Sequence, residues 1–570
     1  GGKNKLTPPP AMAALLPVRG ETNTATVSAY GCIPDLLTEG RFVGAVYSVL
    51  MSVLKVAATG ADWRRVRLTF QEFFERLGKD PVRWGRPASA LLGALYAQLR
   101  LELGAIGGKD SMSGSFEKLD VPPTLISFAL APADARTLVT NVLGAGREVK
   151  IVRMKRAADG MPDLAFAAEL MTAMHKAIAA GDVDFCQVSD EGGDAAAIAV
   201  SCLGEGTGFE FASFGERDLL NSPGDVFVAG RDLSAFDAFG AEVYGRSAAG
   251  GVFSACGETI SAAKLAEAYT GTFEKVYPTK AAAEGEAPVL SFVQRNVAAP
   301  RVKAAKPRVF IPVFPGTNCE YDTARAFERA GAEADIFVIR NRTAAEIEDS
   351  AAEIVKRISA CNILMFPGGF SGGDEPDGSG KFIATTFRNP RIADAVRELL
   401  GSRDGLVLGI CNGFQALVKT GLLPGGSISV QSASSPTLTF NNIARHVSQI
   451  ADVRVASVKS PWLAGVEVGD VFGVAVSHGE GRFVAPEESL KEMAAKGMIA
   501  TQYCDGSSKP VTESPYNPNG SMYAIEGITS EDGRIFGKMG HSERIGANLY
   551  KNIPARFDMK IFESGVKYFA

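Results

Sequence analysis

The sequence predicts a multidomain α/β protein whose second half is built on a mainly parallel sheet. The chain has 570 residues, enough for about three domains of ordinary size. A stretch rich in alanine, proline and charge runs from 281 to 306, as linkers do. After it, apolar runs alternate with helical patterns, and such alternation is typical of a parallel sheet covered on both faces.

Composition narrows the class of protein. Hydrophobic residues make up 46% of the chain and the formal net charge is −5, which favours a soluble globular protein without a nucleic-acid partner. There is no run of about 18 apolar residues, so we expect no membrane segment. Eight irregularly spaced cysteines without a CxxC pair indicate reduced thiols and a cytoplasmic setting. The chain starts Gly-Gly-Lys, without an initiator methionine or signal peptide, so we expect a fragment of a longer protein.

The elements after the linker follow one another in a β-α-β order. The apolar run 309–314 is followed by the helical pattern 322–330, and strand patterns recur at 336–339, 362–366 and 406–408. Functional sites of such sheets lie beyond the carboxyl ends of the strands. Gly316, Gly368 and Cys411 all fall at such ends.

The motif Gly409-Ile410-Cys411-Asn412-Gly413 has the pattern of a nucleophile elbow. It follows the strand at 406–408 and precedes a helical pattern at 414–419. Glycines two residues away on each side permit a sharp strand-to-helix turn, where a Cβ would clash. The helix dipole beyond Cys411 stabilises a thiolate and a developing oxyanion. Cys411 is therefore the candidate nucleophile.

A cysteine nucleophile needs a base, and the chain has only four histidines. His541 directly follows a strand pattern at 534–537, and in an extended segment residues two apart share a face. Glu543 is then placed to orient His541, which completes a Cys-His-Glu triad. We expect His478 to be a structural or substrate-site residue, and His175 and His446 to be structural.

An oxyanion hole is predicted from two backbone N–H groups. The strand at 362–366 runs into a glycine-rich turn at 367–373, whose glycines permit close approach to a ligand. The Gly369 N–H is expected to pair with the Asn412 N–H, which lies at the start of the helix after Cys411.

Several motifs together resemble the class I glutamine amidotransferase domain of phosphoribosylformylglycinamidine synthase, from purine biosynthesis. They lie at 315–320, 367–370, 409–415, 478–483 and 540–543, and the resemblance covers roughly 307–570. The resemblance implies a flavodoxin-like fold. It also implies that Cys411, His541 and Glu543 release ammonia from glutamine through a thioester, with Gln415 and His478 in the glutamine site.

The first half of the sequence has a different pattern of residues. Residues 43–58 and 91–99 have the spacing of packed helices. A glycine-rich segment at 105–114, with Lys109 and Asp110, is predicted to be a loop, but it lacks the spacing of a P-loop. On chemistry alone it either binds phosphate through backbone N–H groups and Lys109 or is a solvated turn.

Segments at 69–78, 107–113 and 121–125 resemble the second synthetase repeat of the large single-chain form of the same family. The resemblance implies a fold like aminoimidazole ribonucleotide synthetase, with one half at 1–130 and an α/β half at 131–280. The family makes its amidine from formylglycinamide ribonucleotide, ATP and ammonia, with Mg²⁺. Nucleotide-phosphate candidates are Gly108, Lys109, Asp110, Ser111, Ser113 and Ser189, and Asp110 is also the candidate metal ligand.

Three departures from the family bear on activity. Met51, with Lys55 one turn on, stands where an acidic metal ligand is expected, and Gln187 replaces an acid two residues before Ser189. The first synthetase repeat, which carries much of the substrate site, is absent from this sequence. We therefore expect this polypeptide to need that missing repeat as a partner to make the amidine.

Two alternatives stay open at this stage. The chain could be another amidotransferase or a cysteine hydrolase with an unrelated first half, which absence of glutamine hydrolysis at Cys411 would favour. The first half could instead be a non-catalytic scaffold, and a nucleotide bound there but not hydrolysed would support that alternative.

Overall fold

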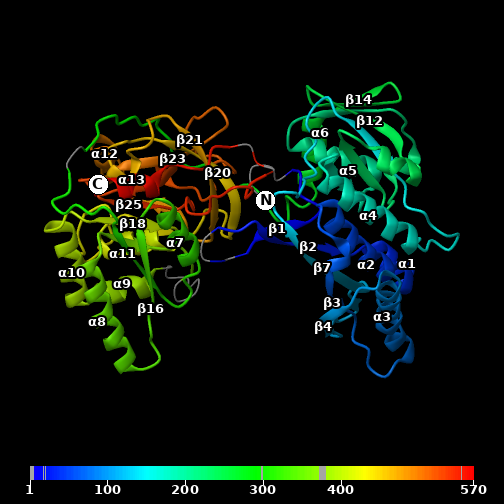
Figure 1. The fold of residues 1–570 in the computed structure, drawn as a ribbon, viewed down its shortest axis with the longest axis horizontal. Coiled ribbons are helices and arrows are strands. Elements are labelled where there is room, and N and C mark those ends of the chain that lie inside the picture. The colour runs from blue at the N-terminus through cyan, green and yellow to red at the C-terminus, as the bar shows by residue number, and fades with distance from the viewer. Residues whose placement is uncertain are drawn as a thin grey trace.

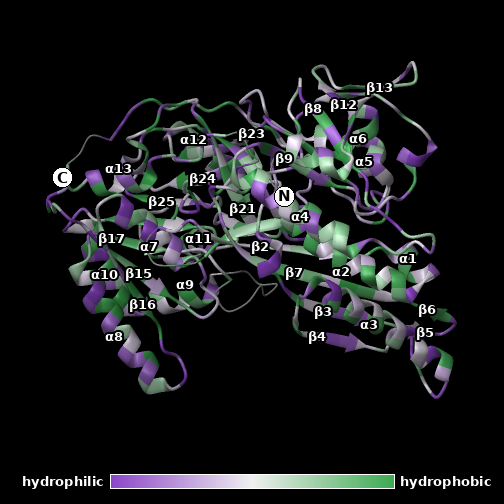
Figure 2. Ribbon diagram, turned by 45° about the vertical axis from the view of Figure 1, so that its right-hand side comes forward, coloured by the Kyte–Doolittle hydropathy of each residue, from purple (hydrophilic) through white to green (hydrophobic). Residues whose placement is uncertain are grey.

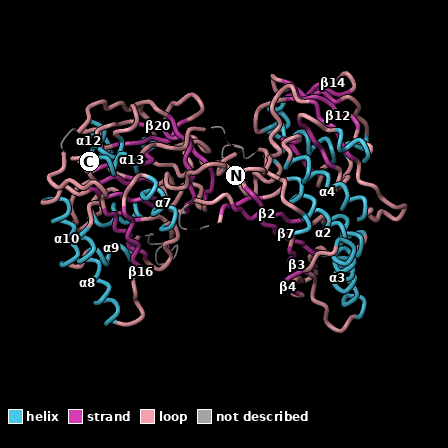
Figure 3. Tube along the Cα trace, in the orientation of Figure 1, coloured by secondary structure: helices cyan, strands magenta, loops and turns pink. Residues whose placement is uncertain are grey.

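The computed structural model describes residues 6–16, 18, 21–296, 299–370, 380–551, 553 and 555–570. The described chain forms two lobes, with the first half of the sequence in one and the second half in the other (Figure 1). Helices flank the strands in both lobes (Figure 3). The glycine-rich turn predicted at 367–373 lies within the described residues only as far as Phe370.

A five-stranded sheet, ordered β1-β2-β7-β3-β4, begins the first lobe. Helix α2 (Arg41–Ala58) packs against β2 and β7 and against α3, because its residues are mostly hydrophobic (Figure 2). Among the described residues α2 is long and apolar enough to cross a membrane, but 83% of it is buried in the core. The bounds are β1 Met12–Leu15, β2 Thr24–Gly31, β3 Arg67–Phe73, β4 Ala105–Ser111, β7 Thr124–Asp134, α1 Pro34–Glu39 and α3 Pro81–Leu101.

A seven-stranded sheet, ordered β14-β13-β10-β12-β8-β11-β9, follows. Helix α4 (Leu164–Ala179) packs against α2, so one hydrophobic core joins the two sheets. Strand β7 passes through residue 130, and the chain leaves the first sheet after Asp134. The remaining bounds are β8 Glu148–Val152, β9 Val183–Val188, β10 Gly208–Phe211, β11 Val226–Gly230, β12 Glu242–Ala248, β13 Val252–Ala255, β14 Glu258–Ser261, α5 Gly193–Leu203 and α6 Ala262–Gly271.

The second lobe contains a nine-stranded sheet, ordered β16-β15-β17-β18-β25-β24-β23-β20-β21. Neighbours from β16 to β25 pair in parallel, and those from β25 to β21 pair antiparallel. The predicted α/β class is confirmed, with an antiparallel extension added to the parallel part. The strands are β15 Arg308–Val313, β16 Glu333–Val338, β17 Ile363–Phe366, β18 Leu406–Ile410, β20 Val447–Val455, β21 Val471–His478, β23 Ile499–Cys504, β24 Ile525–Thr529 and β25 Ile535–Lys538.

Helices of the second lobe cover this sheet and bury its apolar strands. They are α7 Glu320–Arg329, α8 Ala344–Ala360, α9 Lys381–Phe387, α10 Pro390–Gly401, α11 Asn412–Thr420, α12 Glu487–Ala495 and α13 Ile561–Lys567. Short two-stranded sheets add β5 (Ser115–Phe116) with β6 (Leu119–Asp120) and β19 (Thr437–Thr439) with β22 (Arg482–Val484).

The predicted linker packs on the second lobe. Phe292 exchanges backbone hydrogen bonds with Ala456 and Val458, at 2.9 and 3.1 Å. The lobes also touch directly, because Arg329 pairs with Glu21 at 3.2 Å and Lys551 Nζ donates to the Leu138 carbonyl at 3.0 Å.

Gly413 allows α11 to approach β17, and alanine there should destabilise the second lobe. A Cβ at 413 would lie 2.0 Å from the Phe366 carbonyl oxygen, and overpacking of this kind costs about 1–3 kcal/mol. Gly401, at the end of α10, has nothing within 4 Å of the same position, so Gly401→Ala is the matched control and should be neutral or stabilising. Urea unfolding of the full chain compares the two. Equal midpoints for both variants would contradict the close approach.

Candidate active site

Cys411 sits in a strained turn between β18 and α11. Its φ is 53° and its ψ is −109°, a region that side chains rarely adopt and that is found at active sites. Its N–H donates to the Lys538 carbonyl at 2.8 Å, which ties the turn to β25. A Cβ at Gly409 would lie 2.7 Å from the Gly413 carbonyl oxygen. The predicted strand-turn-helix arrangement around Cys411 is confirmed.

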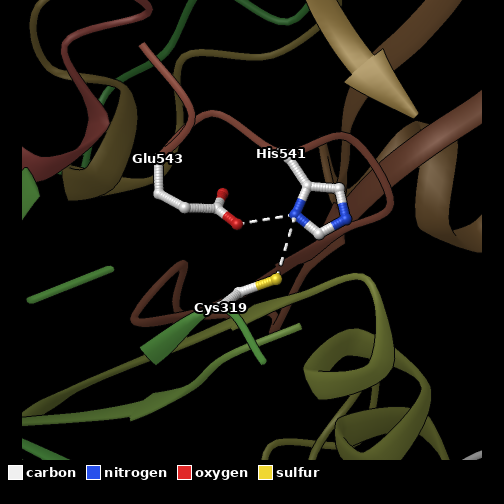
Figure 4. A group of neighbouring side chains, drawn as sticks. All are labelled: Cys319, His541 and Glu543. Carbon is white, nitrogen blue, oxygen red and sulfur yellow. Dashed lines mark hydrogen bonds and ion pairs between the residues drawn. The ribbon is translucent and has the colours of Figure 1, made fainter. Parts of the chain in front are cut away.

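His541 and Glu543 follow β25 and face each other (Figure 4). The Nδ1 of His541 lies 2.6 Å from Glu543 Oε1. The His541 N–H donates to the Ala475 carbonyl of β21 at 2.8 Å, which fixes the backbone of the base. The exposed fractions of His541 and Glu543 are 3% and 2%, so their interaction is shielded from water.

The charge of His541 depends on its neighbours Glu543 and Cys411. Burial alone would lower the pKa of His541, but the negative charges of Glu543 and Cys411, and hydrogen bonds to Cys319 and Cys411, raise this pKa well above its usual range. Burial opposes ionisation of Glu543, yet His541 and then Arg544 hold the pKa of its carboxyl below the usual range. The site therefore favours an imidazolium at His541 beside the carboxylate of Glu543.

A buried ion pair supports the turn that carries His541. Lys538 Nζ lies 2.9 Å from Glu526 Oε1, and both side chains have no exposed surface. Glu526 accepts a hydrogen bond from the Gly540 N–H at 2.7 Å, and Lys538 donates to the Gly540 carbonyl at 2.8 Å. Both backbone groups of the residue before His541 are thus fixed. Sequence reasoning missed Glu526 and Lys538, because their pairing depends on the β24–β25 register.

The glycine turn after β17 lies against the base. A Cβ at Gly368 would lie 2.6 Å from His541 Cε1 and 3.1 Å from Cys319 Sγ. Gly369 has a φ of 144°, and a Cβ there would lie 2.5 Å from the Gly316 carbonyl oxygen. Only glycine lets this turn approach the imidazole so closely. An oxyanion hole made by the N–H groups of Gly369 and Asn412 stays a prediction.

Gln415 and His478 are both buried near the elbow. Gln415 Oε1 accepts from Asn412 Nδ2 at 3.0 Å, and its Nε2 donates to the Glu480 carbonyl. His478 Nδ1 lies 3.2 Å from Asn441 Oδ1, while its Nε2 has no partner among the described residues. Burial, helped by the charges of His541 and His446, lowers the pKa of His478 to about 3. His478 is therefore neutral, and its Nε2 is available to a ligand.

The prediction of a glycine-rich loop at 105–114 is wrong for most of its length. Residues 105–111 form β4, which pairs in parallel with β3 at the edge of the first sheet. The backbone there is extended by strand pairing and does not form a phosphate-binding loop. Lys109 Nζ instead donates to the Asp110 carbonyl and to Ser111 Oγ. Sequence reasoning missed this strand because its partner, β3, is distant in the chain.

The other nucleotide candidates occupy different places. Gly108 lies within β4, where a Cβ would meet the Phe70 carbonyl oxygen at 2.6 Å, and Ser113 lies exposed beyond the strand. Ser189 follows β9 in the seven-stranded sheet and is fully buried, with its N–H donating to the Asp225 carbonyl at 2.7 Å. The structure therefore does not place Ser189 in the same sheet as the β4 residues.

Two positions of the first lobe do not suit Mg²⁺, whereas a pair of carboxylates does. Met51 is fully buried in the apolar core, and the ammonium of Lys55 pairs with Asp190, so neither suits a metal. Asp110 suits one better, because it pairs across the strands with Glu72. Glu72 is buried, and its Oε1 has no partner among the described residues. Burial, followed by the charge of Asp110, raises the pKa of Glu72 to about 7, as expected for carboxylates that lack a counter-ion.

Comparison with known proteins identifies the second half. A family model for CobB/CobQ-like glutamine amidotransferase domains matches residues 306–569. Phosphoribosylformylglycinamidine synthase subunit PurQ of Methanococcus maripaludis is 34% identical over 255 residues, which are 45% of this chain and 87% of that protein. The chain belongs to the phosphoribosylformylglycinamidine synthase family. The PurQ subunit of Aquifex aeolicus is 34% identical over 239 residues, or 42% of this chain and 90% of that protein.

Solved structures of this family are also similar. The PurLQS structure from Thermotoga maritima has a TM-score of 0.33 and 26% identity, over 46% of this chain and 100% of that one. PurL of T. maritima complexed with AMPPCP has a TM-score of 0.36 and 14% identity, over 49% of this chain and 50% of that one.

Replacing Glu543 by glutamine should shift the pH dependence of glutamine hydrolysis. The charge of Glu543 raises the pKa of His541, and the imidazolium is lost as pH rises through that pKa. Glu543→Gln therefore lowers the pKa of His541 and moves the alkaline limb of the kcat/KM profile to lower pH. We also expect kcat to fall by about 10⁴-fold. The control is Glu488→Gln, whose carboxylate is on the surface. An alkaline limb that does not move would exclude Glu543 as the partner of the base.

Proposed function

We propose that this chain releases ammonia from glutamine and supplies it for the conversion of formylglycinamide ribonucleotide to formylglycinamidine ribonucleotide, in purine biosynthesis. The observation that carries the proposal is a cysteine in a strained elbow beside the 2.6 Å His541–Glu543 pair. The names of the relatives support the acceptor. Ammonia passes internally to the synthetase.

The triad performs the hydrolysis in two stages. The Cys411 thiolate attacks the carboxamide carbon of glutamine, and the N–H groups of Gly369 and Asn412 hold the resulting oxyanion. His541 gives its proton to the departing nitrogen, and ammonia leaves a thioester on Cys411. His541 then takes a proton from water, the resulting hydroxide cleaves the thioester, and glutamate leaves. Glu543 holds the imidazole in the required orientation throughout.

Glutamine is bound beside the elbow. We infer that His478 contacts glutamine through Nε2, because this buried nitrogen has no hydrogen-bond partner within the described part of the chain. Gln415 joins α11 to the segment after β21 through the Glu480 carbonyl. In this arrangement Gln415 holds the wall of the glutamine site in place.

The first lobe contributes to the ATP-dependent step. In this proposal Lys109 and Ser111 of β4 and the exposed Ser113 beyond it contact a nucleotide phosphate, and Gly108 and Ser189 are further candidates. Glu72 and Asp110 would hold Mg²⁺, which bound there would neutralise phosphate charge. Both proposals rest on the exposed edge strand β4 and on the two facing carboxylates.

The first synthetase repeat of the family is the proposed partner. The face of the first sheet opposite α2 is open and apolar: Tyr30, Phe128 and Leu130 are exposed by 59%, 41% and 47%. Tyr30 and Phe128 lie directly opposite each other in β2 and β7. Apolar faces of this kind mark interaction sites. A cytoplasmic location is part of the same proposal, since none of the eight cysteines, all of them among the described residues, forms a disulfide.

Two other functions are less favoured. A cysteine hydrolase of another kind would not account for the family match over residues 306–569. A first lobe that only binds a nucleotide for stability is compatible with the same glutaminase site, and turnover of the nucleotide separates the two cases.

Cys411→Ala should abolish glutamine hydrolysis by the chain. In the complete enzyme, glutamine-dependent amidine formation should be lost while ammonia-dependent synthesis survives, because ammonia bypasses the thioester. Cys256→Ala is the control, since Cys256 is an exposed thiol of the first lobe. Product formation from glutamine and from ammonium chloride is measured for each variant. Loss of both activities in Cys411→Ala, or of neither, would reject the assignment.

The nucleotide proposal predicts weaker ATP binding when β4 loses its charges. Lys109→Ala with Asp110→Ala removes the phosphate contact and one metal-facing carboxylate, so ATP affinity in the presence of Mg²⁺ should fall by at least about tenfold. Lys118→Ala, an exposed lysine nearby, is the control. Isothermal titration of the full chain measures the affinity. Unchanged affinity in the double variant would place the nucleotide elsewhere.

A further inference from the structure

A second thiol lies beside the catalytic base. Cys319 directly precedes α7, and its Sγ is 3.9 Å from His541 Nδ1, next to Glu543 (Figure 4). Its exposed fraction is 1%. The hydrolysis of glutamine as described above makes no use of Cys319, although its Sγ would lie 3.1 Å from a Cβ at Gly368 of the oxyanion turn.

We propose that Cys319, His541 and Glu543 form an inhibitory metal site for Zn²⁺ or a cation of similar chemistry. The inference of inhibition rests on the proposed glutaminase function, whereas the metal site itself does not. Thiolate, imidazole and carboxylate are the three ligand types that zinc prefers in proteins. A site with three protein ligands leaves a fourth position for water.

The geometry of the donor atoms fits this metal. The Sγ, Nδ1 and carboxylate oxygen of the three residues lie within 4.8 Å of one another. Zinc bonds of about 2.0–2.3 Å place neighbouring tetrahedral ligands roughly 3.3–3.8 Å apart. The Sγ to Nδ1 distance of 3.9 Å is close to that value, and the Nδ1 to Oε1 distance of 2.6 Å must widen. A rotation of the carboxylate accomplishes this.

Glu543 supplies an independent sign of a missing ligand. Its Oε2 is buried and has no hydrogen-bond partner among the described residues. A buried carboxylate oxygen without a partner is costly. Coordination by a cation would satisfy it.

The positive charge of Arg544, which lies beside Cys319, opposes the binding of a cation at the proposed site. Its Nη2 donates to Cys319 Sγ at 3.0 Å. A thiolate retains lone pairs for a metal while it accepts such a hydrogen bond, and outer N–H donors of this kind support metal-bound ligands. Asp322 lies 3.8 Å from Arg544 Nε and offsets its charge. The thiolate and the Glu543 carboxylate then balance the two charges of the metal.

Occupancy of this site would disable the base. The metal takes the Nδ1 lone pair of His541, and the protons of Nδ1 and of the Cys319 thiol go to solvent. A neutral imidazole bound through Nδ1 keeps its proton on Nε2. Neither nitrogen can then accept a proton, and Glu543 no longer orients the ring. Glutamine hydrolysis stops until the metal leaves.

Co²⁺ is the spectroscopic probe of the site in the full chain. Wild type should show the near-ultraviolet absorption of a cobalt–thiolate bond, and Cys411→Ala should retain it. Cys319→Ser, which keeps a group able to accept from Arg544, and Cys319→Ala should lose it, while Cys256→Ala retains it. A band that survives in both Cys319 variants, or that vanishes in Cys411→Ala, would overturn the assigned ligand set.

Inhibition is measured separately. Zn²⁺ should inhibit wild-type glutamine hydrolysis, and EDTA should restore it. Each Cys319 variant, scored against its own activity without metal, should need more than tenfold higher Zn²⁺, since even outer partners contribute roughly 10–100-fold to metal affinity. Equal sensitivity of all variants would overturn inhibition at this site. A cobalt band without glutaminase activity would reject the proposed function and leave the metal site standing.

Discussion

The close approach of α11 to the end of β17 is the constraint on which the active site depends. Because Gly413 has no side chain, α11 packs closely against the Phe366 carbonyl. The chain reverses direction at Cys411, whose φ is 53°. That conformation costs about 1–3 kcal/mol at a residue with a side chain. The parallel pairing of β18 with β17 on one side and β25 on the other holds it in place. The nucleophile is thus presented by rigid elements.

The base is positioned by the antiparallel extension of the same sheet. His541 hydrogen-bonds to Ala475 in β21, and the residue before it is held by the Glu526–Lys538 pair. Thr501 of β23 also donates to Glu526, so three strands converge on this ion pair. A buried pair is tolerated when further hydrogen bonds satisfy it, and losing one partner typically costs 3–5 kcal/mol. The parallel strand β18 therefore carries the nucleophile, and the base follows β25, where the sheet changes from parallel to antiparallel pairing.

The sequence was most informative where the chemistry is local. The elbow around Cys411 and the two-residue spacing of His541 and Glu543 are each set within a few residues, and both arrangements are found in the structure. Beyond the triad and the oxyanion hole, contacts between distant segments were not predicted. The segment with Lys109 is a strand because β3 pairs with it, although its glycines suggest a loop. Cys319 and Arg544 meet across 225 positions of the chain, and no local pattern marks that contact.

One glycine links catalysis to the proposed metal sensitivity. A side chain at Gly368 would collide with the His541 ring and would press on Cys319 Sγ. The same absence of a Cβ that brings the oxyanion turn to the imidazole therefore also brings a thiol within 3.9 Å of Nδ1. The imidazole of a catalytic base presents one nitrogen to the nucleophile and the other to a carboxylate. At His541 the second nitrogen also lies beside the Cys319 thiol, and the three groups together form a set of metal ligands. The close packing that positions the triad thus also places His541 and Glu543 where, with Cys319, they can bind a metal ion.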